Sequence, residues 1–255
     1  MNVILTTLRK ELASYFYNPV AYVIAVLFYL FRGVDVQALT ESMARYGSDL
    51  DLYTTYYVFR PSSNFMIVLV PPILTMRVFA EEKRTGSLEV LMTAPVRDVE
   101  VVLGKWLAAV AFFAILWLPT LPLLWGLSTG PFLDAPLSFG PAAAAYLGLT
   151  LLGAFLLAAG CFTSSLTDNL LLAALSAMLF NTAVMAGPGL AQTFIADQNV
   201  PAWAETLLEQ INVADHLTNW FARGLVDTSQ IVFYLAGTAF FLFMTVKSLE
   251  SRRWR

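Results

Sequence analysis

The sequence contains very few of the residues on which soluble catalytic and metal sites depend. Of its 255 residues only 13% are charged, and it has one cysteine and one histidine, whereas an ordinary soluble domain carries about 25% charged residues. Cys161 alone cannot form an intramolecular disulfide or a thiolate metal cluster. His216 alone makes a multi-histidine metal site or a Ser/His/Asp triad hard to build, so a structural role is the favoured interpretation. The net charge of −3 and the lack of a basic stripe argue against nucleic acid as a partner.

The residues that are present predict an all-α integral membrane protein. Hydrophobic residues make up 58% of the chain, and they fall in six runs that suit helices of about 20 residues in a bilayer. With connections this short, residues 1–255 form one membrane domain. We expect transmembrane helices over residues 20–39, 64–80, 101–127, 141–162, 170–190 and 231–249.

The first polar segment, residues 1–17, has apolar residues at helical spacing. Arg9, Lys10 and Glu11 interrupt its apolar side, which indicates a helix lying in the membrane interface. The segment does not resemble a cleaved signal peptide, because the first long apolar run begins only after Pro19.

The longest polar segment, residues 191–230, also has large apolar residues at helix-like intervals. This spacing predicts short amphipathic helices packed on the membrane face. The residues concerned are Trp203, Leu207, Leu208, Ile211, Leu217, Trp220 and Phe221.

Prolines interrupt three of the expected spans. Proline removes a backbone donor, so the second and third spans should bend and the fifth should break at its exit. Such bends either let helices rock between two states or only shape static packing. The residues are Pro71 and Pro72, Pro119 and Pro122, and Gly187, Pro188 and Gly189.

The basic residues predict the orientation, because cytoplasmic flanks of membrane spans attract lysine and arginine. With six spans, one side of the membrane collects Arg9, Lys10, Arg77, Lys83, Arg84, Arg97, Lys105, Lys247, Arg252, Arg253 and Arg255. The other side collects only Arg45, Arg60 and Arg223. We therefore expect both termini and residues 81–100 to be cytoplasmic and residues 191–230 to be external.

The densest charge in the chain lies between the second and third spans, where residues 77–105 read RVFAEEKRTGSLEVLMTAPVRDVEVVLGK. Within it, the apolar side of a short helical patch that includes Leu88 and Leu91 suits docking into a groove. Gly86 precedes this patch and Pro95 follows it. The alternative interpretation is a solvated loop with local ion pairs.

Three motifs carry a family resemblance. The pattern Arg77-x-Phe79-x-Glu81-Glu82-Lys83-x-x-Gly86-x-x-Glu89-x-Leu91-x-x-x-Pro95, ending in Gly104-Lys105, resembles the first cytoplasmic loop of ABC type-two exporter permeases, where it forms the coupling helix. Arg9-Lys10-Glu11-Leu12 leading to Tyr17-Asn18-Pro19, and Phe221-x-Arg223-Gly224-x-x-Asp227-Thr228, resemble the gliding-motility type of permease. The resemblance covers the whole chain.

The resemblance implies a role for each matched position. The matched residues that would meet an ATPase subunit are Glu81, Glu82, Gly86, Glu89 and Leu91. Leu88 and Pro95, from the apolar patch and its end, are assigned to the same ATPase-coupling element. Arg9, Lys10 and Glu11 would belong to the interfacial elbow helix, and Arg223, Gly224 and Asp227 to the external helical segment.

No Walker lysine motif occurs in the chain, so ATP and magnesium would be bound by a partner ATPase and the chain would not itself be an enzyme. The implied assembly is two permeases with two ATPases in the lipid bilayer. An auxiliary membrane protein with a periplasmic domain is a further expected partner.

Polar residues inside the expected spans are candidates for a translocation path. Asn181 and Thr182 lie in the fifth span, where interhelical hydrogen bonding is the alternative role. Arg32 and Asp35 lie near the outer end of the first span, where snorkelling to the interface is the alternative.

Two functions remain open on the sequence alone. The first is an exporter permease driven by a separate ATPase. The second is a membrane scaffold of a gliding or envelope machine, in which ATPase coupling remodels partner proteins. An intramembrane hydrolase is disfavoured, because the sequence offers no paired nucleophile and base and no set of metal ligands.

Overall fold

The computed structural model describes residues 3–46, 61–87, 96–129, 139–195 and 201–251, and these residues form helices and connecting turns without a strand. Within these described residues, six helical stretches are long and apolar enough to cross a membrane, which confirms the predicted all-helical membrane fold. They are Pro19–Glu41, Ser63–Thr85, Asp98–Leu123, Phe139–Leu166, Leu170–Phe194 and Thr228–Glu250.

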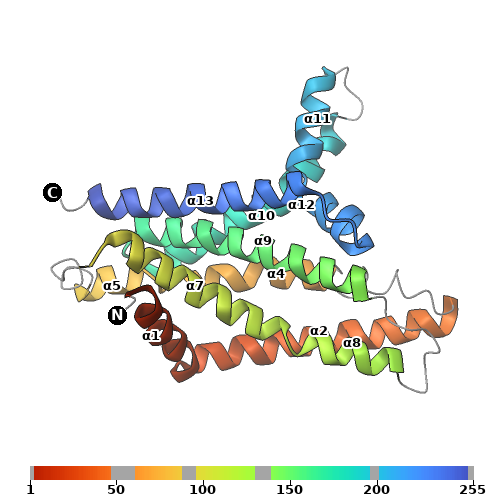
Figure 1. Ribbon diagram of the computed structural model, residues 1–255, viewed down its shortest axis with the longest axis horizontal. Coiled ribbons are helices and arrows are strands. Elements are labelled where there is room, and N and C mark those ends of the chain that lie inside the picture. Colours follow the sequence, from red (N-terminus) through yellow and green to blue (C-terminus); the bar gives the residue numbers. More distant parts are fainter. Residues whose placement is uncertain (1–2, 47–60, 88–95, 130–138, 196–200, 252–255) are drawn as a thin grey trace.

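The helix α9 (Phe139–Leu166) forms the centre of the bundle. It packs against α4 (Pro61–Thr75), α7 (Asp98–Trp117), α10 (Leu170–Ile195) and α13 (Thr228–Glu250) (Figure 1). Membrane helices have little hydrophobic drive to associate, so small residues that allow close approach shape their contacts. A Cβ atom on Gly153 would lie 2.3 Å from the ring of Phe113, and one on Gly160 would lie 2.2 Å from Thr75 Oγ1.

Several helices extend beyond the limits that the apolar pattern suggests. The first spanning helix, α2 (Pro19–Tyr46), continues past residue 39 because a helix ends where its backbone bonding ends and not where hydrophobicity falls. For the same reason α9 starts before residue 141 and ends after residue 162. Residues 163–166, which lie between the predicted fourth and fifth spans, are therefore the last turn of α9.

The prolines act differently in each span. The helix α4 passes through Pro71 and Pro72 and ends at Thr75, whose hydroxyl donates to the carbonyl of Pro71 (2.8 Å). The third span is divided near Pro119 into α7 and α8 (Thr120–Thr129).

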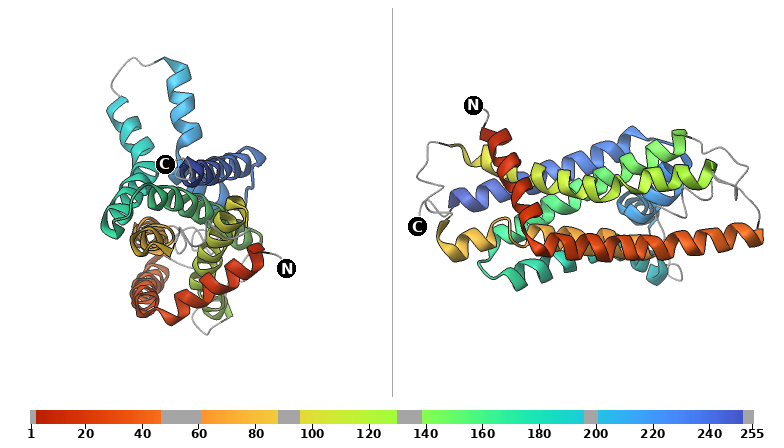
Figure 2. Two further views of the ribbon diagram at one scale, coloured as in Figure 1. Left: turned by 90° about the vertical axis from the view of Figure 1, so that its left-hand side faces the viewer. Right: turned by 90° about the horizontal axis from the view of Figure 1, so that it is seen from below.

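In contrast to the helix-breaking exit expected from Gly187, Pro188 and Gly189, α10 continues to Ile195. Its last turns leave the bundle and pack against α11 (Ala202–Ile211) (Figures 1 and 2). A proline inside a membrane helix is tolerated where neighbouring groups satisfy the freed carbonyls.

The two ends of the bundle differ in their elements. The helix α1 (Val3–Tyr17) lies across the bundle at the end that also holds α5 (Ala80–Thr85) and the last turn of α13 (Figures 1 and 2). The opposite end holds α12 (Val213–Asp215) and the short helices η1 (His216–Trp220) and η2 (Phe221–Arg223).

Candidate functional site at the base of the charged loop

The charged loop begins at α5, and the side chain of Ser164 on α9 fixes its start. The backbone N–H groups of Phe79 and Ala80 donate to Ser164 Oγ at 3.2 and 3.1 Å. Ser164 Oγ in turn donates to the carbonyl of Met76 at 3.3 Å. The first N–H groups of a helix have no partner within the helix, so this buried hydroxyl caps α5 and holds it to the centre of the bundle.

Lys105 connects the loop to two further helices. Its ammonium group donates to Glu11 Oε1 on α1 (2.9 Å), to Glu82 Oε1 on α5 (2.7 Å) and to the carbonyl of Val78 (3.1 Å). The Lys105 side chain is only 3% exposed, whereas those of Glu11 and Glu82 are 20% and 21% exposed. An ammonium group has three donors, and here each has an acceptor. This buried charge therefore binds α1, α5 and α7 together.

Gly104 allows this contact, because α1 packs directly on α7 at that position. A Cβ atom on Gly104 would lie 2.7 Å from Thr7 Cβ and 3.1 Å from the carbonyl oxygen of Ile4. The Gly104-Lys105 pair thus combines a close helix approach with the charge that holds it.

Two further charged contacts lie at α5. Lys83 Nζ reaches the carbonyl of Ser165 at the end of α9, while Arg77 and Glu81 form a more exposed pair at 3.9 Å. The helix ends at Gly86, whose φ of +72° is a left-handed conformation that favours glycine. Leu88, Glu89, Leu91 and Pro95 lie outside the described residues.

The loop returns at the start of α7. There the backbone N–H of Arg97 donates to Glu100 Oε2 at 3.2 Å. The beginning of the loop is thus fixed twice, on α9 through Ser164 and on α7 through Lys105. A displacement of α5 must strain these contacts or move the helices that make them.

The sequence pattern pointed to only part of this cluster. Glu82 and Glu11 were expected to be functional and both bind Lys105, whereas Arg9 and Lys10 are exposed on α1. The pattern gave no special role to Lys105, although a lone lysine at the start of an apolar span needs a partner.

At the opposite end, Arg32 and Asp35 are buried inside the protein. Arg32 Nη1 lies 3.2 Å from Asp35 Oδ2 and also donates to Ser63 Oγ on α4. The guanidinium carbon lies 5.0 Å from the ring centre of Trp117 on α7. This placement shows an interhelical polar cluster and not side chains that snorkel to the interface.

Asn181 and Thr182 point in different directions. Asn181 is fully buried, and neither atom of its side-chain amide has a hydrogen-bond partner among the described residues. Thr182 is exposed and donates to the Met178 carbonyl of its own helix at 2.8 Å. Of these two residues, only Asn181 therefore presents a polar group to the bundle interior.

The expected external residues have local structural roles. Gly224 ends η2 with a φ of +79° and packs closely on Pro141. Asp227 begins α13 by accepting from the N–H and the hydroxyl of Ser229, at 3.1 and 2.9 Å, and these bonds lower the pKa of its carboxyl group. Arg223 is exposed.

Six apolar helices with a charged, anchored loop define a multi-pass membrane protein. The sequence profile of the ABC-2 family transporter proteins matches residues 33–246. The chain belongs to this family and is an ABC transporter permease, a membrane component that associates with an ABC ATPase subunit. No curated protein matches the chain.

Proposed function

We propose that the chain is the permease subunit of an ABC exporter, in which residues 81–100 receive force from a separate ATPase and move substrate across the cytoplasmic membrane. The observation that carries this proposal is the buried Lys105, which joins α5 to α1 and α7. A loop that only filled the gap between two spans would not need a buried charge at its base, because burying an ion is costly.

The contacts of α5 give the proposed path of force. A push on α5 passes through Lys105 to α7 and α1, and through Ser164 to α9. Because α9 packs on α4, α7, α10 and α13, a shift of α9 changes the packing of most of the bundle. Packed helices move as units, so a small displacement at one end is transmitted along the spans.

The proposed orientation has both termini and α5 in the cytoplasm. Most of the described lysines and arginines lie at the end of the bundle that holds α1 and α5, as the preference of cytoplasmic flanks for positive charge requires. In this arrangement ATP and magnesium are bound by the partner, and α1 is the interfacial helix.

Asn181 is the proposed polar contact of the translocation path. A buried amide without a partner is costly in a membrane, and such a group suits a polar substrate or water that passes it. A narrower proposal, which rests on the sequence resemblance, is that the chain belongs to the gliding-motility type of permease within this family.

The test is co-purification of the tagged chain with an ABC ATPase from its native membranes. Replacing Leu88 and Leu91 together by glutamate should abolish recovery of the ATPase while leaving membrane insertion intact. The matched control replaces Leu225 and Val226, which are exposed at the opposite end, by glutamate, and should retain the ATPase. Equal recovery from both double variants would remove residues 81–100 as the coupling element.

A further inference from the structure

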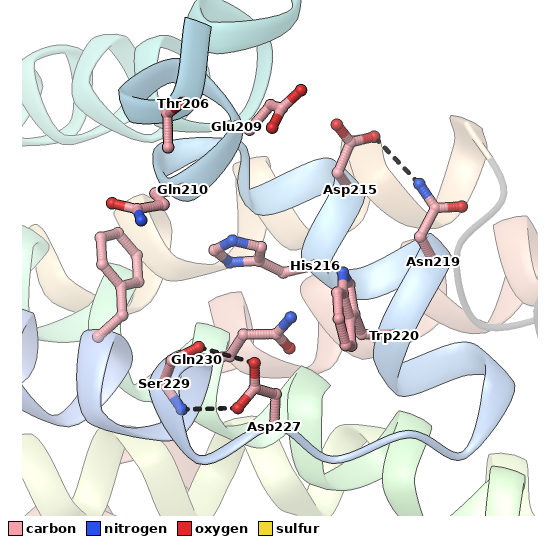
Figure 3. Close-up of a pocket in the computed structure, with 11 residues that line it drawn as sticks. Thr206, Glu209, Gln210, Asp215, His216, Asn219, Trp220, Asp227, Ser229 and Gln230 are labelled. Atoms are coloured by element: carbon pink, nitrogen blue, oxygen red, sulfur yellow. Dashed lines mark hydrogen bonds between the residues drawn. The ribbon is translucent and has the colours of Figure 1, made fainter. Parts of the chain in front are cut away.

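A second polar site lies at the end of the bundle opposite α5. A cavity of about 650 Å³ opens between α11, η1 and the first turns of α13 (Figure 3). Small-molecule sites commonly have volumes of about 300–1,000 Å³, so this cavity is large enough for a ligand. The lining residues that matter here are Glu209, Asp215, His216, Trp220, Asp227 and Gln230.

Two buried polar side chains of the lining have atoms without a protein partner. His216 is 7% exposed and Gln230 is 5% exposed. Among the described residues, neither His216 Nδ1 nor Gln230 Oε1 has a hydrogen-bond partner. Figure 3 shows the imidazole in the middle of the lining residues, with Gln230 below it. Buried polar atoms nearly always have a partner, so these two side chains, which both line the cavity, keep hydrogen-bonding capacity that the described part of the protein does not use.

The packing of His216 shows that its ring is held in place. The imidazole makes edge-to-face contacts with Phe233 and Tyr234, with ring centres 5.8 and 6.2 Å away and planes at 84° and 90°. These contacts hold the ring in a fixed position beside the cavity that it lines.

The charge of the lining is negative. Glu209, Asp215 and Asp227 contribute carboxyl groups, and among the described residues that line the cavity none is a lysine or an arginine. Asp215 accepts from Asn212 and Asp227 accepts from Ser229, and these neutral donors leave the negative charge of the carboxylates uncompensated. The site therefore favours a cation.

The kind of cation follows from the ligand atoms. No group of three or more His, Cys, Asp or Glu side chains among the described residues could hold a metal ion, so a metal lacks its ligand set. The lining instead combines carboxylates, the acceptor Gln230 Oε1 and the partly exposed indole of Trp220. The face of an indole ring attracts an organic ammonium group, and carboxylates attract the same positive charge.

We propose that this cavity binds a primary ammonium group, with the carboxylates of Glu209 and Asp227 and the ring of Trp220 around the charge and His216 and Gln230 bonding the polar part of the ligand. A free small amine and the ethanolamine headgroup of a lipid share this chemistry. The inference does not depend on the ATPase, so it stands or fails separately from the proposed function.

The test measures binding to the purified full chain in detergent by its tryptophan fluorescence and by thermophoresis, with putrescine and ethanolamine as probes. A second arm compares nanodiscs of phosphatidylethanolamine with nanodiscs of phosphatidylcholine. The variants are Glu209→Gln and Trp220→Leu, both at exposed positions where folding should not depend on the side chain. Glu250→Gln, at the other end of α13, is the matched control.

We expect Glu209→Gln and Trp220→Leu each to weaken amine binding at least fivefold and Glu250→Gln to leave it unchanged. Binding of the free amines supports a soluble ligand, while a response only to phosphatidylethanolamine nanodiscs supports the lipid headgroup. Absence of binding in both arms, or equal binding by all variants, would overturn the proposal. The proposal would also be overturned if Mn²⁺ or Ca²⁺ bound the chain more tightly than the amines and this metal binding was weakened by the same two substitutions.

Discussion

Replacing Lys105 by methionine removes the ammonium group that joins α1, α5 and α7 but keeps much of the side-chain length. An ion pair about 4 Å apart gains about 4 kcal/mol at an effective dielectric constant of about 20, although desolvation offsets much of this attraction. After the substitution, Glu11 and Glu82 face each other without the cation between them.

The expected cost follows from the burial of the three groups. Removing one partner of a buried ion pair costs about 3–5 kcal/mol. Because Glu11 and Glu82 are each about one-fifth exposed, water relieves part of the repulsion, and we expect about 3 kcal/mol. In a chain of this size the loss corresponds to a fall in melting temperature of roughly 6–12 °C.

The assay is the fraction of monodisperse protein that survives heating in detergent, followed by size-exclusion chromatography. Lys247→Met is the matched control, because the pair of Lys247 with Glu250 is exposed and such pairs contribute about 0–1 kcal/mol. The triple variant Glu11→Gln, Glu82→Gln, Lys105→Met removes the uncompensated charges and should recover about half of the loss. A Lys105→Met shift no larger than that of Lys247→Met would refute the reasoning.

Three further substitutions test the packing and the titration. Ser164→Ala leaves two buried N–H groups at the start of α5 without an acceptor and should lower stability by about 1–3 kcal/mol. The same melting assay measures this loss. The control Ser176→Ala, on the exposed face of α10, should have no effect. Gly153→Ala drives a methyl group into Phe113 and should cost about 1–3 kcal/mol; an unchanged melting temperature would disprove the close contact.

The same set includes one pH dependence. Burial lowers the pKa of His216, although Asp215 and Asp227 act in the opposite direction. The folded state therefore binds fewer protons at His216 than the unfolded state does. The contribution of this histidine to the stability of the folded state is present above the ordinary histidine pKa of about 6.5 and is lost as pH falls below it. The melting temperature should fall between pH 7.5 and 5.5, and less so in His216→Gln; identical profiles would contradict this.

The spans could be predicted because each one is encoded locally. About 20 apolar residues in succession need a lipid solvent whatever the rest of the chain does, so all six appear in both the pattern and the structure. Helix ends were harder, because local bonding decides whether a proline such as Pro188 ends the helix or only diverts it.

The site could be predicted only in part, because its contacts join distant segments. Glu82 was singled out by its place in a charged loop, but its partner Lys105 lies 23 residues away and Glu11 lies 94 residues from Lys105. Charge alone does not show which carboxylate a lysine meets. The buried Arg32 and Asp35 are three residues apart on one helix, so their pairing was within reach of spacing rules, but their burial depends on α4 and α7.

The central claim is that an ATPase acts on the loop between the second and third spans, and a cross-link from that loop tests it most directly. Cys161 is buried, so Ser87→Cys, at an exposed position just beyond α5, would supply the reactive thiol. A bifunctional maleimide added to native membranes should join this position to an ABC ATPase, identified by mass spectrometry, and should not do so from Leu225→Cys at the opposite end. Cross-linking of the ATPase from Leu225→Cys and not from Ser87→Cys would contradict the account.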